Sequence, residues 1–234
     1  MITTVFFDLY NTLAGFQPSR YEIQSQALGD FGIQVTPKGI LRGYALADAF
    51  MSEQNATKPT RSLDRQERRD FFAEYERRVL EGAGVEVDRD KALDIWRRVR
   101  EVPYGLTRFA DVLPVLDALK REDLTLGLIT NINQDGDELA GSLGLMSHLD
   151  FTLTSSEVGS EKPNPPIFLA ALEKAGASPD EAVHVGDQLT SDIAGARSVG
   201  ISPVLLDRDG NHVGYSEAPR IEGLAELPGV LAGL

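Results

Sequence analysis

The feature that most constrains the fold is an alternation of short apolar runs with helical patterns. The runs are continuous, which is typical of strands covered on both faces. They are Thr4–Phe7, Thr125–Ile129, Phe151–Thr154, Ala182–Val185 and Ser202–Leu206. The helical patterns between them are Val112–Lys120, Pro166–Ala175 and Ser191–Val199, and the last two are followed by Gly176 and Gly200. Such alternation predicts an α/β fold with a doubly wound, Rossmann-like parallel sheet.

Residues 15–103 interrupt this rhythm with a helical block that contains no convincing strand. Asp64 and Glu67 form a capping pair before one of its helices. The four helical patterns are Ser19–Phe31, Pro37–Gln54, Arg65–Glu81 and Arg89–Arg100. We therefore predict a core domain of residues 1–14 and 104–234, with an α-helical domain of residues 15–103 inserted after the first strand.

Composition excludes several classes of protein. The net charge of −13 argues against a broad basic surface for nucleic acid. The chain contains no cysteine, and no stretch approaches the roughly 20 apolar residues of a membrane span. Because Met1 runs into a strand without leader features, we expect a cytoplasmic protein. A small anionic substrate, which needs only a local positive site, remains compatible with this charge, and the sequence carries no signature of oligomeric state.

Polar side chains follow four of the five predicted strands. In an open parallel sheet, ligands bind beyond the carboxyl ends of the strands, so these side chains can form one site. Only the last run, Ser202–Leu206, lacks such a group. The residues are Asp8 and Thr12 after the first run, Thr130 and Asn131 after the second, Lys162 after the third, and Asp187 and Asp192 after the fourth.

Phosphoryl chemistry uses these residue types. Asp8 is a candidate nucleophile for a covalent aspartyl intermediate. Asp187, with Asp192 five residues later, can hold Mg²⁺, which favours sparse carboxylate sites completed by water and substrate oxygens. Each of these residues alone has an ordinary explanation as a turn or a helix cap. Four such signals in this order, each after a predicted strand, are much stronger evidence for a site than any one of them.

Two further groups complete the pattern. The hydroxyl of Thr12 or Thr130 can donate to a phosphoryl oxygen, and Asn131 can contact the same group. Lys162 supplies positive charge to offset the carboxylates and a dianionic substrate.

Four segments resemble the motifs of the haloacid dehalogenase-like hydrolase superfamily: VFFDLYNTL, LGLITN, EKPNP and VHVGDQLTSD. The helical block resembles the helical cap that this superfamily inserts between its first two motifs. The resemblance implies that Asp8 is the nucleophile and that Thr130 and Asn131 contact the transferring group. It also implies that Lys162 stabilises the negative charges of the nucleophile and of the phosphoryl group. It also implies that Mg²⁺ is bound by Asp8, Asp187 and the Tyr10 carbonyl, with Asp192 completing or orienting that shell.

Tyr10 departs from the pattern of the similar phosphatases, which carry a second aspartate at this position as general acid and base. Tyrosine, with an ordinary pKa near 10, is a poor base at neutral pH. A tyrosine here resembles the dehalogenase branch, whose halide leaving group needs no proton. The acidic pair Asp187 and Asp192 resembles the phosphatases instead, because without a cation three carboxylates would crowd around Lys162.

We therefore predict a Mg²⁺-dependent phosphatase that acts on a small phosphorylated metabolite through an aspartyl-phosphate. One alternative is a metal-independent 2-haloacid dehalogenase that forms an aspartyl ester. Such an enzyme needs a cationic halide acceptor, for which Arg20 and Arg42 are candidates by location alone. The other alternative is a catalytically weak binding protein that retains the site.

Overall fold

The computed structural model describes residues 1–234 and divides the chain into two compact units. Met1–Gly15 and Thr107–Leu234 form one unit, called here the core unit. Phe16–Leu106 forms the other, called the helical unit. No helix in the structure combines the length and the apolar character needed to cross a membrane.

A six-stranded parallel sheet in the order β5-β4-β1-β6-β7-β8 forms the centre of the core unit, which confirms the predicted fold class. The register places Phe7 beside Leu128 and Val185, so the residues that follow β1, β4 and β6 meet at one edge. The strands are β1 (Thr4–Phe7), β4 (Thr125–Thr130), β5 (Phe151–Thr154), β6 (Ala182–Gly186), β7 (Ser202–Leu206) and β8 (Arg220–Ile221). The two-residue strand β8 is too short to give a sequence pattern.

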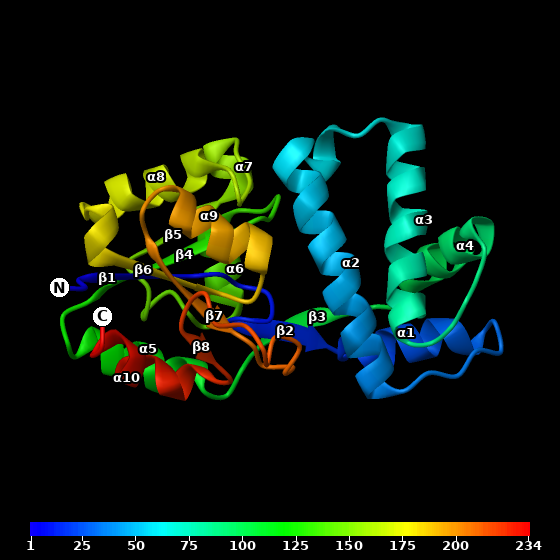
Figure 1. The fold of residues 1–234 in the computed structure, drawn as a ribbon, viewed down its shortest axis with the longest axis horizontal. Coiled ribbons are helices and arrows are strands. Elements are labelled where there is room, and N and C mark those ends of the chain that lie inside the picture. The colour runs from blue at the N-terminus through cyan, green and yellow to red at the C-terminus, as the bar shows by residue number, and fades with distance from the viewer. The chain divides into compact units, whose positions relative to one another are not determined.

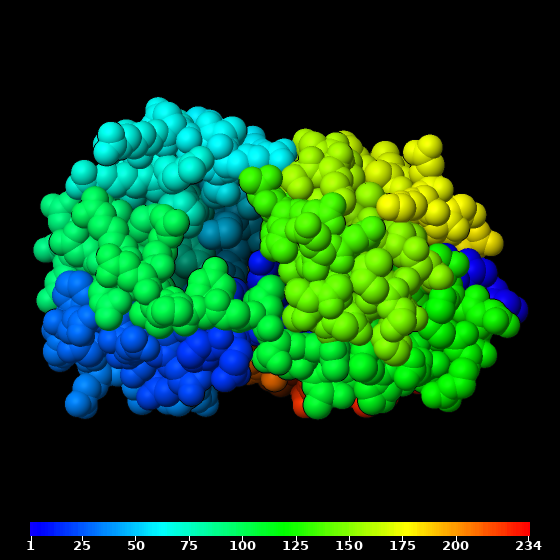
Figure 2. Space-filling view, turned by 180° about the vertical axis from the view of Figure 1, so that it is seen from behind, coloured from blue at the N-terminus to red at the C-terminus, as the bar shows by residue number.

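Helices cover both faces of this sheet. Figure 1 shows α8 and α9 on one face and α5 and α10 on the other. In Figure 2 the visible surface of the core unit is mainly green to yellow, and all four residues of β1 are buried. The helices are α5 (Val112–Lys120), α6 (Gly136–Ser142), α7 (Ser155–Val158), α8 (Pro165–Ala175), α9 (Gly195–Ser198) and α10 (Leu227–Leu231).

Helix α8 is fixed against the sheet by the apolar stripe that the sequence predicted. Ile167, Phe168, Ala171 and Leu172 are all buried, in one cluster with residues of β1, β4 and β5. Fully burying a side chain such as Ile or Phe contributes about 1.5–3 kcal/mol. Since Lys162 lies just before this helix, the same packing fixes the chain that carries it.

The segment after β6 differs from the single helix predicted over Ser191–Val199. Leu189–Ala194 is π-helical, and α9 follows. The carbonyl of Gln188 accepts from the amides of both Asp192 and Ile193, and the second bond closes a wider, π-type turn. The Asp192 side chain reaches so close to Gly186 that a Cβ there would lie 2.2 Å from Asp192 Cγ. Glycine is therefore required at position 186.

The helical unit contains four α-helices, and the one capping pair that the sequence predicts is present. Asp64 and Glu67 form the predicted capping box at the start of α3, and Ser19 forms another with Glu22 at the start of α1. Gly43 and Gly82 let α2 and α3 cross closely, because a Cβ on Gly43 would lie 2.0 Å from the Val79 carbonyl oxygen. The helices are α1 (Arg20–Gly29), α2 (Pro37–Thr57), α3 (Arg65–Gly82) and α4 (Arg89–Val99).

The expectation that residues 15–103 contain no strand is wrong at one end. Strand β2 (Ala14–Gln17) extends into this range and pairs with β3 (Gly105–Arg108) in a two-stranded sheet. Each strand has four residues and is only partly buried. Neither carries the continuous apolar run by which the other strands were predicted.

Glu76 is a buried acid in the helical unit. It is 1% exposed and accepts a hydrogen bond from the side-chain amide of Gln24. Burial raises the pKa of Glu76 to about 8, and the Gln24 hydrogen bond only partly offsets this. Glu76 is therefore mostly protonated near neutral pH in the folded chain.

This burial predicts pH-dependent stability. The pKa of Glu76 is 4.5 ordinarily and about 8 when folded, so between these values only the folded state keeps the proton. The free energy of unfolding should therefore fall as pH rises through this window, by at most about 1.4 kcal/mol per pH unit. Glu76→Gln should remove the Glu76 contribution and make the slope shallower in urea unfolding measured from pH 5 to 8. Glu53→Gln, at an exposed position on α2, is the control and should keep it.

Candidate active site

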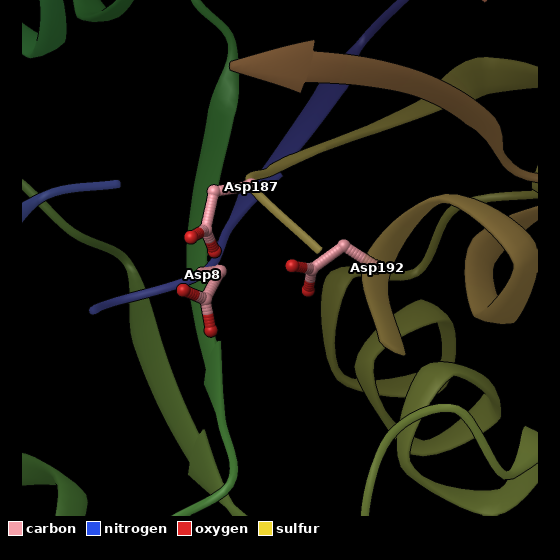
Figure 3. Close-up of side chains that lie close together, drawn as sticks. All are labelled: Asp8, Asp187 and Asp192. Carbon is pink, nitrogen blue, oxygen red and sulfur yellow. The ribbon is translucent and has the colours of Figure 1, made fainter. Parts of the chain in front are cut away.

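Three carboxylates converge where β1 and β6 end. Asp8 directly follows β1, and its amide donates to the Val185 carbonyl over 2.9 Å. Asp187 directly follows β6, and Asp192 comes from the π-helical turn. One oxygen from each lies within 4.8 Å of the others, and Figure 3 shows the Asp192 side chain pointing toward Asp8 and Asp187.

Lys162 joins two of these carboxylates. It is 2% exposed, and its Nζ donates to Asp8 Oδ1 and to Asp192 Oδ1, each over 2.6 Å. Burial alone would lower the pKa of Lys162, but the charges of Asp192 and Asp8 raise it above its ordinary value. Lys162 is therefore a buried ammonium held in place by two acids, as a buried charge requires.

The pKa values of Asp8 and Asp192 shift in opposite directions in this environment. Burial raises the pKa of Asp8 to about 6, although the nearby Lys162 charge opposes the rise. Burial also opposes ionisation of Asp192, but Lys162 and His184 together hold its pKa below its ordinary value. Asp192 is thus the firmly ionised partner of Lys162, and Asp8 is the carboxylate whose charge is most easily changed.

His184 belongs to the site although sequence analysis did not select it. It is fully buried in β6, and its Nε2 lies 3.0 Å from Asp192 Oδ1. Burial lowers the pKa of His184, so the neutral ring donates Nε2–H to that carboxylate. A polar residue inside the apolar run Ala182–Val185 was the available signal.

Asn131 holds the backbone of Lys162. Its side-chain amide donates to the Lys162 carbonyl over 2.9 Å, and its Oδ1 accepts from the Lys162 amide over 2.7 Å. The structure therefore brings Asn131 into the site through Lys162. Contact with a transferring group stays a prediction.

Thr12 and Thr130 provide two buried hydroxyls without a protein partner. Both residues are 0% exposed, and neither Oγ1 makes a hydrogen bond. A buried polar group left unpaired costs about 1–3 kcal/mol, so such groups need an explanation. An anionic ligand that accepts from these hydroxyls would provide one.

The turn after Asp8 contains Tyr10 and Asn11. Tyr10 is half-buried and forms an isolated bridge with Ala14. Asn11 has a left-handed backbone (φ 58°), and its side-chain amide donates to Asp187 Oδ2 over 3.2 Å. Sequence analysis did not select Asn11, because its partner lies 176 residues away in the chain. A metal contact of the Tyr10 carbonyl stays a prediction.

The fold and the site define an α/β protein that collects acids, an amide, hydroxyls and a lysine at the carboxyl edge of a Rossmann-like parallel sheet. A family model of haloacid dehalogenase-like hydrolases matches residues 2–200. The chain therefore belongs to the haloacid dehalogenase-like hydrolase family, and it is a hydrolase.

Individual relatives carry two kinds of name. A glyceraldehyde 3-phosphate phosphatase from Methanothermobacter thermautotrophicus is 30% identical over 217 residues, covering 89% of this chain and 87% of that protein. The structure of a 2-haloacid dehalogenase from Pseudomonas syringae pv. Tomato DC3000 is 30% identical, with a TM-score of 0.58 and coverage of 100% and 99%. The structure of a HAD phosphatase from Thermococcus onnurineus is 26% identical, with a TM-score of 0.58 and 99% coverage of both chains. Several other curated relatives match over only 33–53% of their own length.

Proposed function

We propose that this hydrolase is a Mg²⁺-dependent phosphatase that acts on a small phosphorylated metabolite through an aspartyl-phosphate on Asp8. The observation that carries the proposal is the approach of Asp187 to Asp8 within the cluster of three carboxylates. The Lys162 ammonium donates hydrogen bonds to Asp8 and to Asp192. Asp187 brings a further negative charge close to Asp8, and a divalent cation between these two carboxylates would offset their repulsion.

The donor set fits Mg²⁺. Carboxylate and carbonyl oxygens suit this hard cation, which keeps several waters and needs only a few protein ligands. Asp8, Asp187 and the Tyr10 carbonyl would hold it. Asp192 would orient the site, because its oxygens already accept from Lys162, His184 and the Gln188 amide. When bound, the ion would neutralise charge on the phosphoryl oxygens.

The side chains of this chain would carry the remaining steps. The Asp8 carboxylate attacks phosphorus while the bond to the leaving oxygen breaks, and water then cleaves the aspartyl-phosphate to release phosphate and regenerate Asp8. Lys162 and the Thr12 and Thr130 hydroxyls donate to charge that develops on the oxygens. The unpaired state of both hydroxyls supports this role, since a phosphoryl group supplies the missing acceptors.

Tyr10 and the Pseudomonas syringae relative favour a second candidate, a metal-independent 2-haloacid dehalogenase. The structure weakens the support for its halide acceptor. Arg20 is paired with Asp48 over 2.6 Å, and Arg42 Nε donates to the Gly82 carbonyl over 2.7 Å. The phosphatase names of the Methanothermobacter and Thermococcus relatives favour the first candidate.

A hydrolysis screen tests the proposal. Phosphate esters, acyl phosphates and 2-haloacids are each assayed with Mg²⁺ and with chelator. We expect phosphate release that requires Mg²⁺ and no halide release. Metal-independent chloride release from a 2-chloro acid would overturn the proposal in favour of the dehalogenase. Metal binding without any turnover would indicate the weak binding protein.

Calorimetry with Mg²⁺ tests the metal site directly. We expect Asp187→Asn to weaken Mg²⁺ binding at least tenfold, about 1.4 kcal/mol, because a charged ligand becomes a neutral amide. Asp209→Asn is a matched control, since Asp209 lies near the same Asn11 amide (3.4 Å) but outside the cluster. Equal binding by the wild type and Asp187→Asn would contradict the assignment.

A further inference from the structure

The loop after β7 contains charged side chains whose hydrogen bonds the sequence did not indicate. Its first residue, Asp207, is buried and accepts from the Asn211 amide, the His212 amide and Arg220 Nε over 2.8–2.9 Å. The Asp207 amide donates to the Ile221 carbonyl over 2.8 Å. These bonds fix the backbone at the start of the loop, so the next residue, Arg208, extends from a rigid position.

Arg208 is held on three sides. Its two terminal nitrogens donate to both oxygens of Asp111 over 2.9 and 3.0 Å, which is the paired geometry that a guanidinium favours. Its guanidinium carbon lies 4.3 Å from the centre of the Phe109 ring. Asp111 is fixed in turn by the Leu224 amide over 3.0 Å. A side chain with this much support has little freedom to move.

The remaining bond of Arg208 reaches the turn that follows Asp8. Its Nη2 donates to the Thr12 carbonyl over 2.9 Å, across 196 residues of sequence. Inside the turn, the Leu9 carbonyl accepts from the amides of Thr12, Leu13 and Ala14 over 2.8–3.3 Å. Arg208 therefore fixes, from outside the cluster of carboxylates, the peptide group of the residue whose hydroxyl is buried without a partner.

A second contact joins the same loop and turn. Asp209 Oδ2 lies 3.4 Å from the Asn11 side-chain amide, which also donates to Asp187. Two consecutive residues of the loop thus contact two consecutive residues of the turn. Asp209 is exposed and its contact is long, so Arg208 is the stronger constraint.

We propose that Arg208 is a positioning residue for hydrolysis: it holds the Thr12 peptide so that the Thr12 hydroxyl stands where a phosphoryl oxygen binds. This inference rests on the proposed function. Lysine cannot replace the guanidinium here, because a single ammonium lacks the planar fork that reaches Asp111 and the Thr12 carbonyl together.

The test is a double-mutant cycle between Arg208→Lys and Thr12→Ala, with para-nitrophenyl phosphate and Mg²⁺. We expect Arg208→Lys to lower kcat about tenfold or more, with KM changed less than twofold, because it misplaces a hydroxyl needed mainly in the transition state. In the Thr12→Ala background the same substitution should change kcat less than twofold, since the hydroxyl is already absent. Thermal melts of all four proteins report whether each folds.

Amide hydrogen exchange of residues 9–14 gives a readout without turnover. Exchange should rise in Arg208→Lys and stay unchanged in Arg197→Lys, a control whose guanidinium binds Glu217 instead. Unchanged exchange in Arg208→Lys, or equal kcat effects with and without Thr12, would overturn the positioning role. A wild type that hydrolyses no phosphate would overturn the proposed function, and exchange alone would then decide whether Arg208 holds the turn.

Discussion

Asp8→Asn is expected to reduce hydrolysis to the background rate while the chain remains folded. A carboxamide is a very poor nucleophile, so no aspartyl-phosphate forms. The change keeps the shape of the side chain. It also leaves Lys162 its second acid, Asp192, at 2.6 Å, so the buried ammonium stays paired.

The measurement is phosphate release in the Mg²⁺ assay, with circular dichroism as the check on folding. Asp117→Asn on α5 is the control, because this exposed aspartate pairs with His148, which is not one of the site residues. The control should keep wild-type turnover. If Asp8→Asn retains a rate within about tenfold of wild type, roughly 1.4 kcal/mol in barrier, Asp8 does not act as nucleophile.

Tyr10→Asp is expected to raise the hydrolysis of alkyl phosphates. An alkoxide leaving group needs a proton, and the new carboxyl group stands where similar phosphatases carry their general acid. A well-placed acid contributes about 10²–10⁴-fold. An activated aryl phosphate, whose leaving group needs little protonation, should gain less.

The same substitution separates the two candidate enzymes. In a dehalogenase the new carboxylate would repel an anionic haloacid, so dehalogenation should fall without any gain of phosphatase activity. Tyr10→Asn is the matched control, because it has the shape of Asp but cannot transfer the proton. Tyr10 is half-buried, so a thermal melt must show that the aspartate is tolerated. Equal rates for Tyr10→Asp and Tyr10→Asn on an alkyl phosphate would show that no acid was gained.

The sequence by itself determined five of the six strands of the central sheet. Three of the five apolar runs, Thr4–Phe7, Phe151–Thr154 and Ser202–Leu206, are strands with the predicted bounds, and the other two each extend by one residue. Such runs are predictable because a strand buried on both faces has no place for regular polar positions. The sequence predicts for a related reason that Asp8, Lys162, Asp187 and Asp192 meet, and the structure brings them together. The carboxyl ends of parallel strands lie at one edge, whatever the exact packing.

The tertiary structure alone decided which groups each of these residues contacts. Asn131 is bound to the Lys162 backbone, 31 residues away, and His184 supports Asp192 through a π-type turn that no apolar periodicity indicates. Arg208 reaches Thr12 across 196 residues. Local patterns report the face that a residue buries. A hydrogen bond between distant segments depends on the register of the sheet and on the packing of the loops beyond it, and these are set only when the whole core unit folds.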